Sequence, residues 1–197
     1  TLHLMQSEAL AVTLKVTETL ERLHVSYVIG GSMASASHGR IRATLDVDIV
    51  AALTIKDVTQ LVHGLDEEFY ADANMIRTAV INRGSFNLIH RTTMFKVDIF
   101  VVGDRQFDRR QLERRRLQVL APPDGKAFVA SAEDVILAKL DCYRQGGEVS
   151  ERQWDDIQGI LDVQGERLDV AYLRRWAADL NVADLLDRAL TESQAGR

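Results

Sequence analysis

The 197-residue sequence contains one cysteine and two prolines. The single cysteine, Cys142, cannot form an internal disulfide, which excludes a disulfide-stapled secreted protein and favours a reducing cytoplasm. No apolar run is long enough to span a bilayer, and no charged-then-apolar segment resembles a signal peptide. We therefore expect a cytoplasmic protein without a membrane partner.

An excess of positive charge is also missing. The chain has 24 Lys and Arg against 29 Asp and Glu, a formal net charge of -5. A global positive field for nucleic acid is thereby excluded, although residues 108–116, "DRRQLERRR", are locally basic. Because this segment also contains Asp108 and Glu113, a solvated, salt-bridged face is favoured over RNA contact.

The composition that is present suits a globular fold with a real core, at 46% hydrophobic and 27% charged residues. No repeat, low-complexity tract or Gly/Ser-rich linker divides the chain. We predict an α/β (α+β) core over residues 1–130, with a helical C-terminal region over 131–197 packed on it.

The pattern of apolar residues predicts the elements of this fold. We expect a mixed sheet that includes two antiparallel neighbours at 85–90 and 94–102. Thr54 and Asp57, at capping-box spacing, predict a helix that begins at Thr54. The expected helices cover residues 7–25, 32–39, 54–65, 72–84, 131–147, 150–161, 169–180 and 182–194. The expected strands cover residues 26–31, 45–53, 85–90, 94–102 and the ends of 107–120 and 121–130.

Two aspartates separated by one residue stand inside the apolar run "LDVDIVAAL" (45–53). Side chains alternate along a strand, so Asp46 and Asp48 share one face and leave Val47 and Ile49 on the other. Two carboxylates roughly 7 Å apart along a strand repel each other unless a cation or water lies between them. Mg²⁺ prefers oxygen ligands and therefore fits this pair.

A third carboxylate, Asp98, is central in the apolar run "FKVDIFVV" (95–102). Three acids on the polar faces of two strands are the donor set of a two-metal site that aligns a phosphoryl displacement. We predict that Asp46, Asp48 and Asp98 bind two Mg²⁺ ions, with Mn²⁺ as an alternative. For Asp98 taken alone, an edge or solvent-exposed position is the competing interpretation.

Gly30 and Gly31 end the strand at 26–31 and precede the helix-like segment that begins at Ser32. Glycine permits unusual backbone angles and the close approach of a ligand, and a helix N-terminus offers free N–H groups to an anion. We predict a phosphate cradle here, with a plain turn as the alternative. The segment is neither a P-loop nor a G-x-G-x-x-G fingerprint.

A strand, "GGS", a short helix, "D-h-D-h" with h apolar, and a later acidic strand resemble the DNA polymerase β-like nucleotidyltransferase superfamily. The string "HGR-x-R-x-T-x-D-x-D" is similar to the bacterial AbiEii-type (abortive infection) nucleotidyltransferases. Residues 131–161 look like the C-terminal part of the same group, and the matching segments cover roughly a third of the chain. The superfamily resemblance is carried by Gly30, Gly31, Ser32, Asp46, Asp48 and Asp98.

The resemblance implies an enzyme that moves a nucleoside monophosphate from an NTP such as ATP to an acceptor hydroxyl. The acceptor classes are an RNA or tRNA end, a protein and a small molecule. The glycine turn and Ser32 would hold the triphosphate, and Asp46 and Asp48 would bind bridging Mg²⁺ ions. Asp98 would bind the second metal and help activate the acceptor.

The resemblance also implies supporting roles outside the acidic strands. Arg40, Arg42 and Thr44 would contact phosphate, against a solvated loop or pairing with the acids as the alternative. Lys139 would reach the triphosphate and Asp156 would orient it, against a surface lysine with an apolar stem as the alternative.

Several functions share this pattern. The toxin-like resemblance implies one component of a toxin–antitoxin pair, with a partner protein. Lincosamide and aminoglycoside nucleotidyltransferases share the early motif, so an antibiotic acceptor is an alternative. A catalytically silent binding or regulatory protein is another, but the presence of all three acids favours an enzyme. A phosphohydrolase that uses the acids on water is disfavoured by the glycine cradle.

Overall fold

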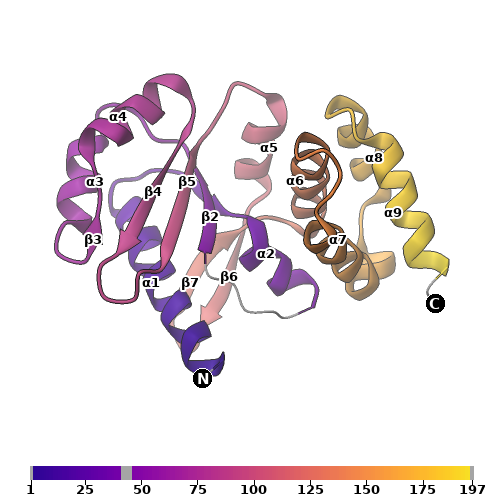
Figure 1. Cartoon of the computed structure of the whole chain (residues 1–197), viewed down its shortest axis with the longest axis horizontal. Helices are drawn as coiled ribbons and strands as arrows, with labels where there is room; N and C mark the ends of the chain where they lie inside the picture. Colours follow the sequence, from indigo (N-terminus) through magenta and orange to yellow (C-terminus); the bar gives the residue numbers. More distant parts are fainter. Residues whose placement is uncertain (1, 41–45, 196–197) are drawn as a thin grey trace. The chain divides into compact units, whose positions relative to one another are not determined.

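The computed structural model describes residues 2–40 and 46–195. The chain divides into two compact units (Figure 1). The first comprises residues 1–30 and 43–129, and the second comprises residues 31–42 and 130–197. Within its described residues the first unit contains the sheet, and the second is helical.

The described part of the first unit contains seven strands and four helices. The strands are β1 (Tyr27–Ile29), β2 (Asp46–Ala51), β3 (Phe69–Tyr70), β4 (Ser85–His90), β5 (Lys96–Val101), β6 (Arg116–Ala121) and β7 (Gly125–Val129). The helices are α1 (Leu2–Arg22), α3 (Val58–Leu65), α4 (Ala73–Asn82) and α5 (Gln106–Arg114).

The strands form one mixed sheet in the order β3-β4-β5-β2-β1-β7-β6. The two parallel pairs are β2 with β5 and β1 with β7. β4 and β5 are antiparallel neighbours, so the pairing predicted from their short separation is confirmed. The predicted α/β class with a mixed sheet is confirmed as well.

One face of the central strands is apolar because hydrophobic residues recur at every second position. On β2, Val47, Ile49 and Ala51 are buried, and Val97 and Ile99 are buried beside them on β5. Helix α1 contacts β6 and β7, α4 contacts β4, and α3 contacts both helices. These helices supply apolar side chains at helical spacing, as α1 does with Val12, Val16 and Leu20.

The helix predicted to begin at Thr54 instead begins at Val58, with Asp57 at its N-cap. The Asp57 carboxylate accepts hydrogen bonds from the backbone N–H (2.8 Å) and the hydroxyl (2.7 Å) of Thr54. These bonds close a turn over residues 55–57. This contact closes a turn before α3 and does not cap the helix, so the predicted start at Thr54 is wrong.

The second unit contains α2 (Gly31–His38), α6 (Ala132–Gln145), α7 (Glu151–Gln164), the 3₁₀ turn η1 (Gly165–Arg167), α8 (Val170–Asp179) and α9 (Ala183–Ala195). Helices α6 and α7 pack together, and α2 packs on both. α8 contacts α6 and α9, and α9 contacts α7. The chain directly after α2 lies close to α7, since a Cβ on Gly39 would lie 2.9 Å from the backbone nitrogen of Ile160.

Serine side chains cap the N-termini of α6 and α7. The Ser131 hydroxyl oxygen accepts a hydrogen bond from the Asp134 backbone N–H at 3.2 Å. Ser150 does the same for the N–H of Gln153 at 3.4 Å. Each bond satisfies one of the N–H groups that a helix start leaves without a partner.

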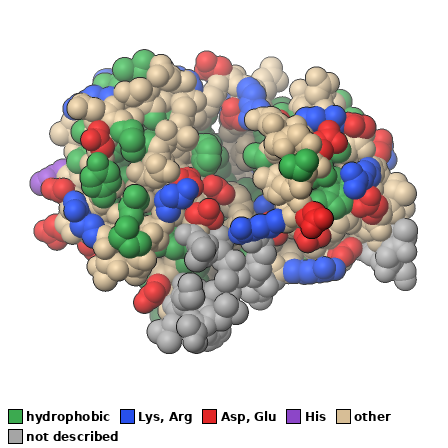
Figure 2. Space-filling view, viewed as in Figure 1, with side chains coloured by type: hydrophobic (Ala, Val, Ile, Leu, Met, Phe, Trp, Pro, Cys, Tyr) green, Lys and Arg blue, Asp and Glu red, His purple; other side chains and the backbone are tan. Residues whose placement is uncertain are grey.

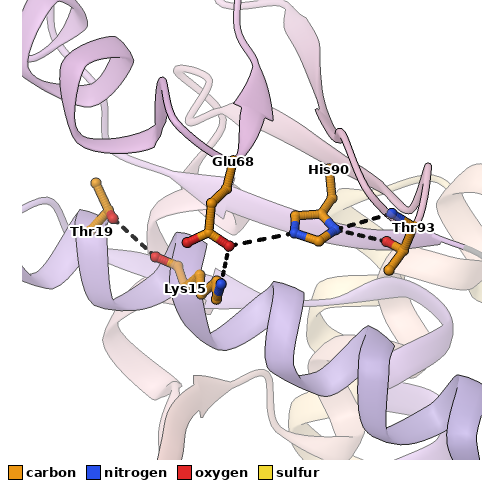
Figure 3. Close-up of polar contacts among 5 residues, drawn as sticks. All are labelled: Lys15, Thr19, Glu68, His90 and Thr93. Carbon is orange, nitrogen blue, oxygen red and sulfur yellow. Dashed lines mark hydrogen bonds and ion pairs between the residues drawn. The ribbon is translucent and has the colours of Figure 1, made fainter.

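A polar contact chain links α1 to the β3–β4 edge of the first unit (Figure 3). Lys15 on α1 forms an ion pair with Glu68, whose carboxylate also lies 3.6 Å from His90 Nε2. His90 Nδ1 in turn lies 2.9 Å from the Thr93 hydroxyl. The hydrogen bond from Lys15 is the main cause that lowers the pKa of the Glu68 carboxyl below its ordinary value.

This lowered pKa predicts a small acid-sensitive contribution to stability. A carboxyl with a depressed folded-state pKa stabilises the fold above its unfolded pKa, and the contribution is lost as the pH falls through the folded pKa. We expect Glu68→Gln to unfold at lower urea than the parent at pH 7, with the difference shrinking below about pH 4.5. The measurement is the urea midpoint from pH 3 to 7 with the exposed Glu67→Gln as control. A pH-independent difference would contradict the prediction.

Candidate functional site

The three predicted carboxylates lie on the same face of the sheet in the first unit. β2 and β5 are parallel, and their register sets Asp48 directly opposite Asp98 and Asp46 opposite Lys96. Neighbouring strands are about 4.8 Å apart, so opposed side chains on one face are adjacent. In the space-filling view, acidic side chains gather beside a basic one over β2 and β5 (Figure 2).

Asp98 is held from both sides. Asn87, opposite it on β4, donates a hydrogen bond from Nδ2 to Asp98 Oδ1 at 2.8 Å. Lys96 Nζ contacts the other oxygen, Oδ2, at 2.8 Å. The Asp98 side chain is 15% exposed, so the competing interpretation of a solvent-exposed acid does not describe it.

Lys96 adds a positive charge to the group formed by Asp46, Asp48 and Asp98. Its pKa is raised, first by the hydrogen bond to Asp98 and then by the charges of Asp98, Asp46 and Asp48, against an opposing effect of burial. An ammonium group beside three carboxylates reduces their mutual repulsion.

The chemistry of the donor set fits a hard divalent cation. Three carboxylates on one sheet face supply the oxygen ligands that Mg²⁺ prefers. With the side chains as they lie, no three His, Cys, Asp or Glu residues in ranges 2–40 and 46–195 converge on a common ion position. The contacts of Asp98 give a physical reason, because Lys96 and Asn87 each hold one of its oxygens.

The glycine turn directly adjoins the acidic strand. The Gly30 backbone N–H donates to the carbonyl of Asp48 at 2.9 Å, which extends the β1–β2 pairing beyond Ile29. Gly31 has φ of 55°, a conformation that glycine adopts without strain. A Cβ on Gly30 would meet no described atom within 4 Å, so its backbone is open to close approach. Ser32 follows as the second residue of α2.

Lys139 and Asp156 meet in the second unit, where α6 packs on α7. Lys139 Nζ lies 2.8 Å from Asp156 Oδ2, and their side chains are only 9% and 7% exposed. Lys139 is therefore a buried, paired lysine, and the alternative of a surface lysine does not describe it. The neighbouring Asp155 is exposed.

The predicted phosphate-binding loop is described only at Arg40. Its guanidinium pairs with Asp162 of α7 at 2.9 Å, and the Ser193 hydroxyl donates to the other oxygen of Asp162. Arg42 and Thr44 lie outside the described residues. The role of all three in binding phosphate stays a prediction.

The basic segment at 108–116 is an ion-paired surface, as its mixed charges predicted. Arg105 pairs with Asp108 at 2.9 Å, and Arg110 pairs with Glu113 at 2.8 Å. Such pairs use part of the positive charge that RNA would require.

Two residues that contact Asp98, Asn87 and Lys96, were not predicted from the sequence as part of the site. Both had a detectable signal, because each is a polar residue inside an apolar strand. Lys96 precedes Asp98 by two residues and so must share its face. Asn87 could be assigned only once the register of β4 against β5 was known.

An open depression of about 780 Å³ lies elsewhere in the first unit, along α1 and the end of α3. Its lining includes Lys15, Arg22 and several acids but none of the predicted site residues. The carboxylates on the sheet carry a specific chemical pattern, whereas this depression is a solvated surface of mixed charge.

No protein-family model matches the chain, and no curated protein matches it in sequence. Two solved structures resemble it over most of their length. An antigenic nucleotidyltransferase-like protein from Paracoccidioides brasiliensis is 19% identical with a TM-score of 0.54, covering 90% of this chain and 92% of its own. The antibiotic-resistance factor ANT(2'')-Ia is 13% identical with a TM-score of 0.55, covering 88% and 96%.

At these identities the likeness establishes the fold, and the chain has the fold of nucleotidyltransferase-like proteins. The resemblance inferred from the glycine turn and the aspartates agrees with this fold, and membership of the nucleotidyltransferase superfamily stays a prediction. The narrower similarity to AbiEii-type proteins stays a prediction. Among the helices of residues 2–40 and 46–195, none combines the length and apolar character needed to cross a membrane.

Proposed function

We propose that the chain is a divalent-metal-dependent nucleotidyltransferase that moves a nucleoside monophosphate from an NTP to an acceptor hydroxyl. One observation carries the proposal. Asp46, Asp48 and Asp98 share one sheet face, with Asp48 opposite Asp98 and the Gly30 backbone bonded to the Asp48 carbonyl. A phosphate group held at the glycine turn would therefore lie next to a face of carboxylates.

The roles below are those that the resemblance implies, and the chemistry of each residue is compatible with its role. Asp46 and Asp48 would hold the ions through carboxylate oxygens, and Asp98 would hold the second ion near the acceptor. When bound, Mg²⁺ would neutralise the negative charge that develops on the phosphate oxygens during the reaction. The open Gly30 backbone, the N–H groups at the start of α2 and the Ser32 hydroxyl would bind phosphate oxygens.

The reaction that this arrangement supports is a single displacement. The acceptor oxygen forms a bond to the α-phosphorus, and the bond from that phosphorus to the oxygen bridging to the β-phosphate breaks. Pyrophosphate leaves, and the hydroxyl proton passes to a base beside the acceptor. Asp98, with one oxygen held by Asn87, is suited to keep that hydroxyl in place.

The acceptor is the open part of the proposal. An RNA or tRNA end, a protein hydroxyl and a small molecule all fit the chemistry, and a toxin with an antitoxin partner is one biological setting for it. An antibiotic acceptor is a second candidate, since the fold of ANT(2'')-Ia matches most of the chain.

The first test measures NTP binding, because it needs no knowledge of the acceptor. Each of the four NTPs is titrated calorimetrically into the protein with Mg²⁺ and then with EDTA. We expect binding that requires Mg²⁺. α-³²P-labelled NTP is then supplied with tRNA, with denatured total protein or with an aminoglycoside, and the labelled product identifies the acceptor. A folded chain that binds no NTP in Mg²⁺ would contradict the proposal.

A further inference from the structure

Lys96 occupies a distinctive place beside the carboxylates. It lies opposite Asp46 in the register of β2 and β5, and two residues before Asp98 on the same face. Its ammonium contacts Asp98 Oδ2, while its side chain stays 43% exposed. The Lys96 side chain therefore contacts Asp98 through its ammonium, and its exposed stem leaves room for the ammonium to move away into solvent.

The electrostatics of the sheet explain why a cation is present there. Like charges directly opposite each other on neighbouring strands destabilise a sheet, and Asp48 faces Asp98 in this way. A cation close to such a pair offsets the repulsion. Lys96 provides that cation from within the chain, at a carboxylate that a divalent ion would also need.

We propose that Lys96 is an internal counter-ion of the carboxylates in the metal-free protein, and that a divalent ion must displace its ammonium from Asp98. Asn87 keeps hold of Oδ1, so the exchange takes place at Oδ2. Lys96 is thus a positioning residue that lowers the metal affinity and stabilises the empty site. This inference rests on the proposed function, because it assumes that the same carboxylates bind metal.

The test measures metal binding directly, without turnover. Mn²⁺ binding to the full chain is followed by electron paramagnetic resonance of the free ion. We expect Lys96→Met, which keeps the length of the stem and removes the charge, to lower the Kd for Mn²⁺ by about tenfold. Lys96→Arg keeps the charge and is expected to bind Mn²⁺ within about threefold of the parent.

Two control variants separate this local effect from other causes. Lys56→Met removes the same charge at an exposed turn after β2 and is expected to leave the Kd unchanged. Asp98→Asn removes the charged carboxylate for which Lys96 and the metal compete, and it is expected to weaken Mn²⁺ binding.

Stability supplies a second measurement. In EDTA, Lys96→Met should unfold at lower urea than the parent, because the carboxylates lose their counter-ion. Addition of Mg²⁺ should raise the urea midpoint more in Lys96→Met than in the parent, since ligand binding stabilises according to its affinity.

The outcomes distinguish the two proposals. Equal Mn²⁺ affinity in Lys96→Met and the parent, with weaker binding in Asp98→Asn, would overturn the role of Lys96 and leave the proposed function standing. Mn²⁺ binding by Lys96→Met but not by the parent would support the role of Lys96 as an internal counter-ion. Absence of binding in the parent and in Lys96→Met would overturn both.

Discussion

Replacement of Asp48 with asparagine is expected to lower the rate of nucleotide transfer by about a thousandfold or more. Asparagine keeps the size of the side chain and a carbonyl oxygen but removes the negative charge that a metal ligand needs. Asp48 is central in β2, directly opposite Asp98, so the loss affects the carboxylate pair rather than one isolated group.

The same substitution should not harm the fold. It removes the repulsion between two opposed carboxylates, so the urea midpoint in EDTA should be unchanged or higher. The measurement is transfer of label from α-³²P-NTP to the acceptor found for the parent, together with an unfolding curve. Asp104→Asn is the matched control, because this aspartate is 80% exposed and pairs only loosely with Arg109 at 3.6 Å. Full transfer activity in Asp48→Asn would contradict the assignment of Asp48.

The second large effect is expected at the buried pair in the helical unit. Asp156→Ala would leave the Lys139 ammonium buried without its partner, and we expect a loss of about 3–5 kcal/mol in the free energy of unfolding. The double variant Lys139→Met/Asp156→Leu replaces both charges with apolar groups of similar size. It should recover most of that loss, because neither side chain then carries an unpaired charge.

The measurement is the urea unfolding of each variant, with Asp155→Ala on the exposed side of α7 as control. We expect the control to stay within about 0.5 kcal/mol of the parent. Equal destabilisation by the single and double variants would show that the pair does not act as proposed.

The double variant also tests the functional prediction for Lys139. If Lys139 contacts the triphosphate, the double variant folds yet binds NTP more weakly than the parent. If NTP binding is unchanged, the pair is structural and Lys139 is not part of the nucleotide site. A stable variant is needed for this comparison, since a destabilised one would lose binding for an unrelated reason.

Local pattern determined a large part of this protein. The alternation of apolar and polar residues put Asp46 and Asp48 on one face of a strand, because side chains alternate along any extended chain. The glycine pair, the caps at Ser131 and Ser150 and the helical spacing of α1 follow from neighbours within a few residues. Helix α3 begins at Val58 and not at Thr54, because the side-chain bond between Thr54 and Asp57 closes a turn ahead of the helix.

The tertiary structure decided which side chains meet. Nothing in a single strand states that Asp48 lies opposite Asp98, or that Asn87 and Lys96 share the Asp98 carboxylate. Those pairings depend on the register between strands, which is set by the packing of the whole apolar face. The burial of Lys139 with Asp156 likewise depends on how α6 packs on α7, because the two residues are 17 positions apart in the sequence. The kinds of side chain in the candidate site could therefore be predicted from the sequence, whereas their contacts with one another depend on the tertiary structure.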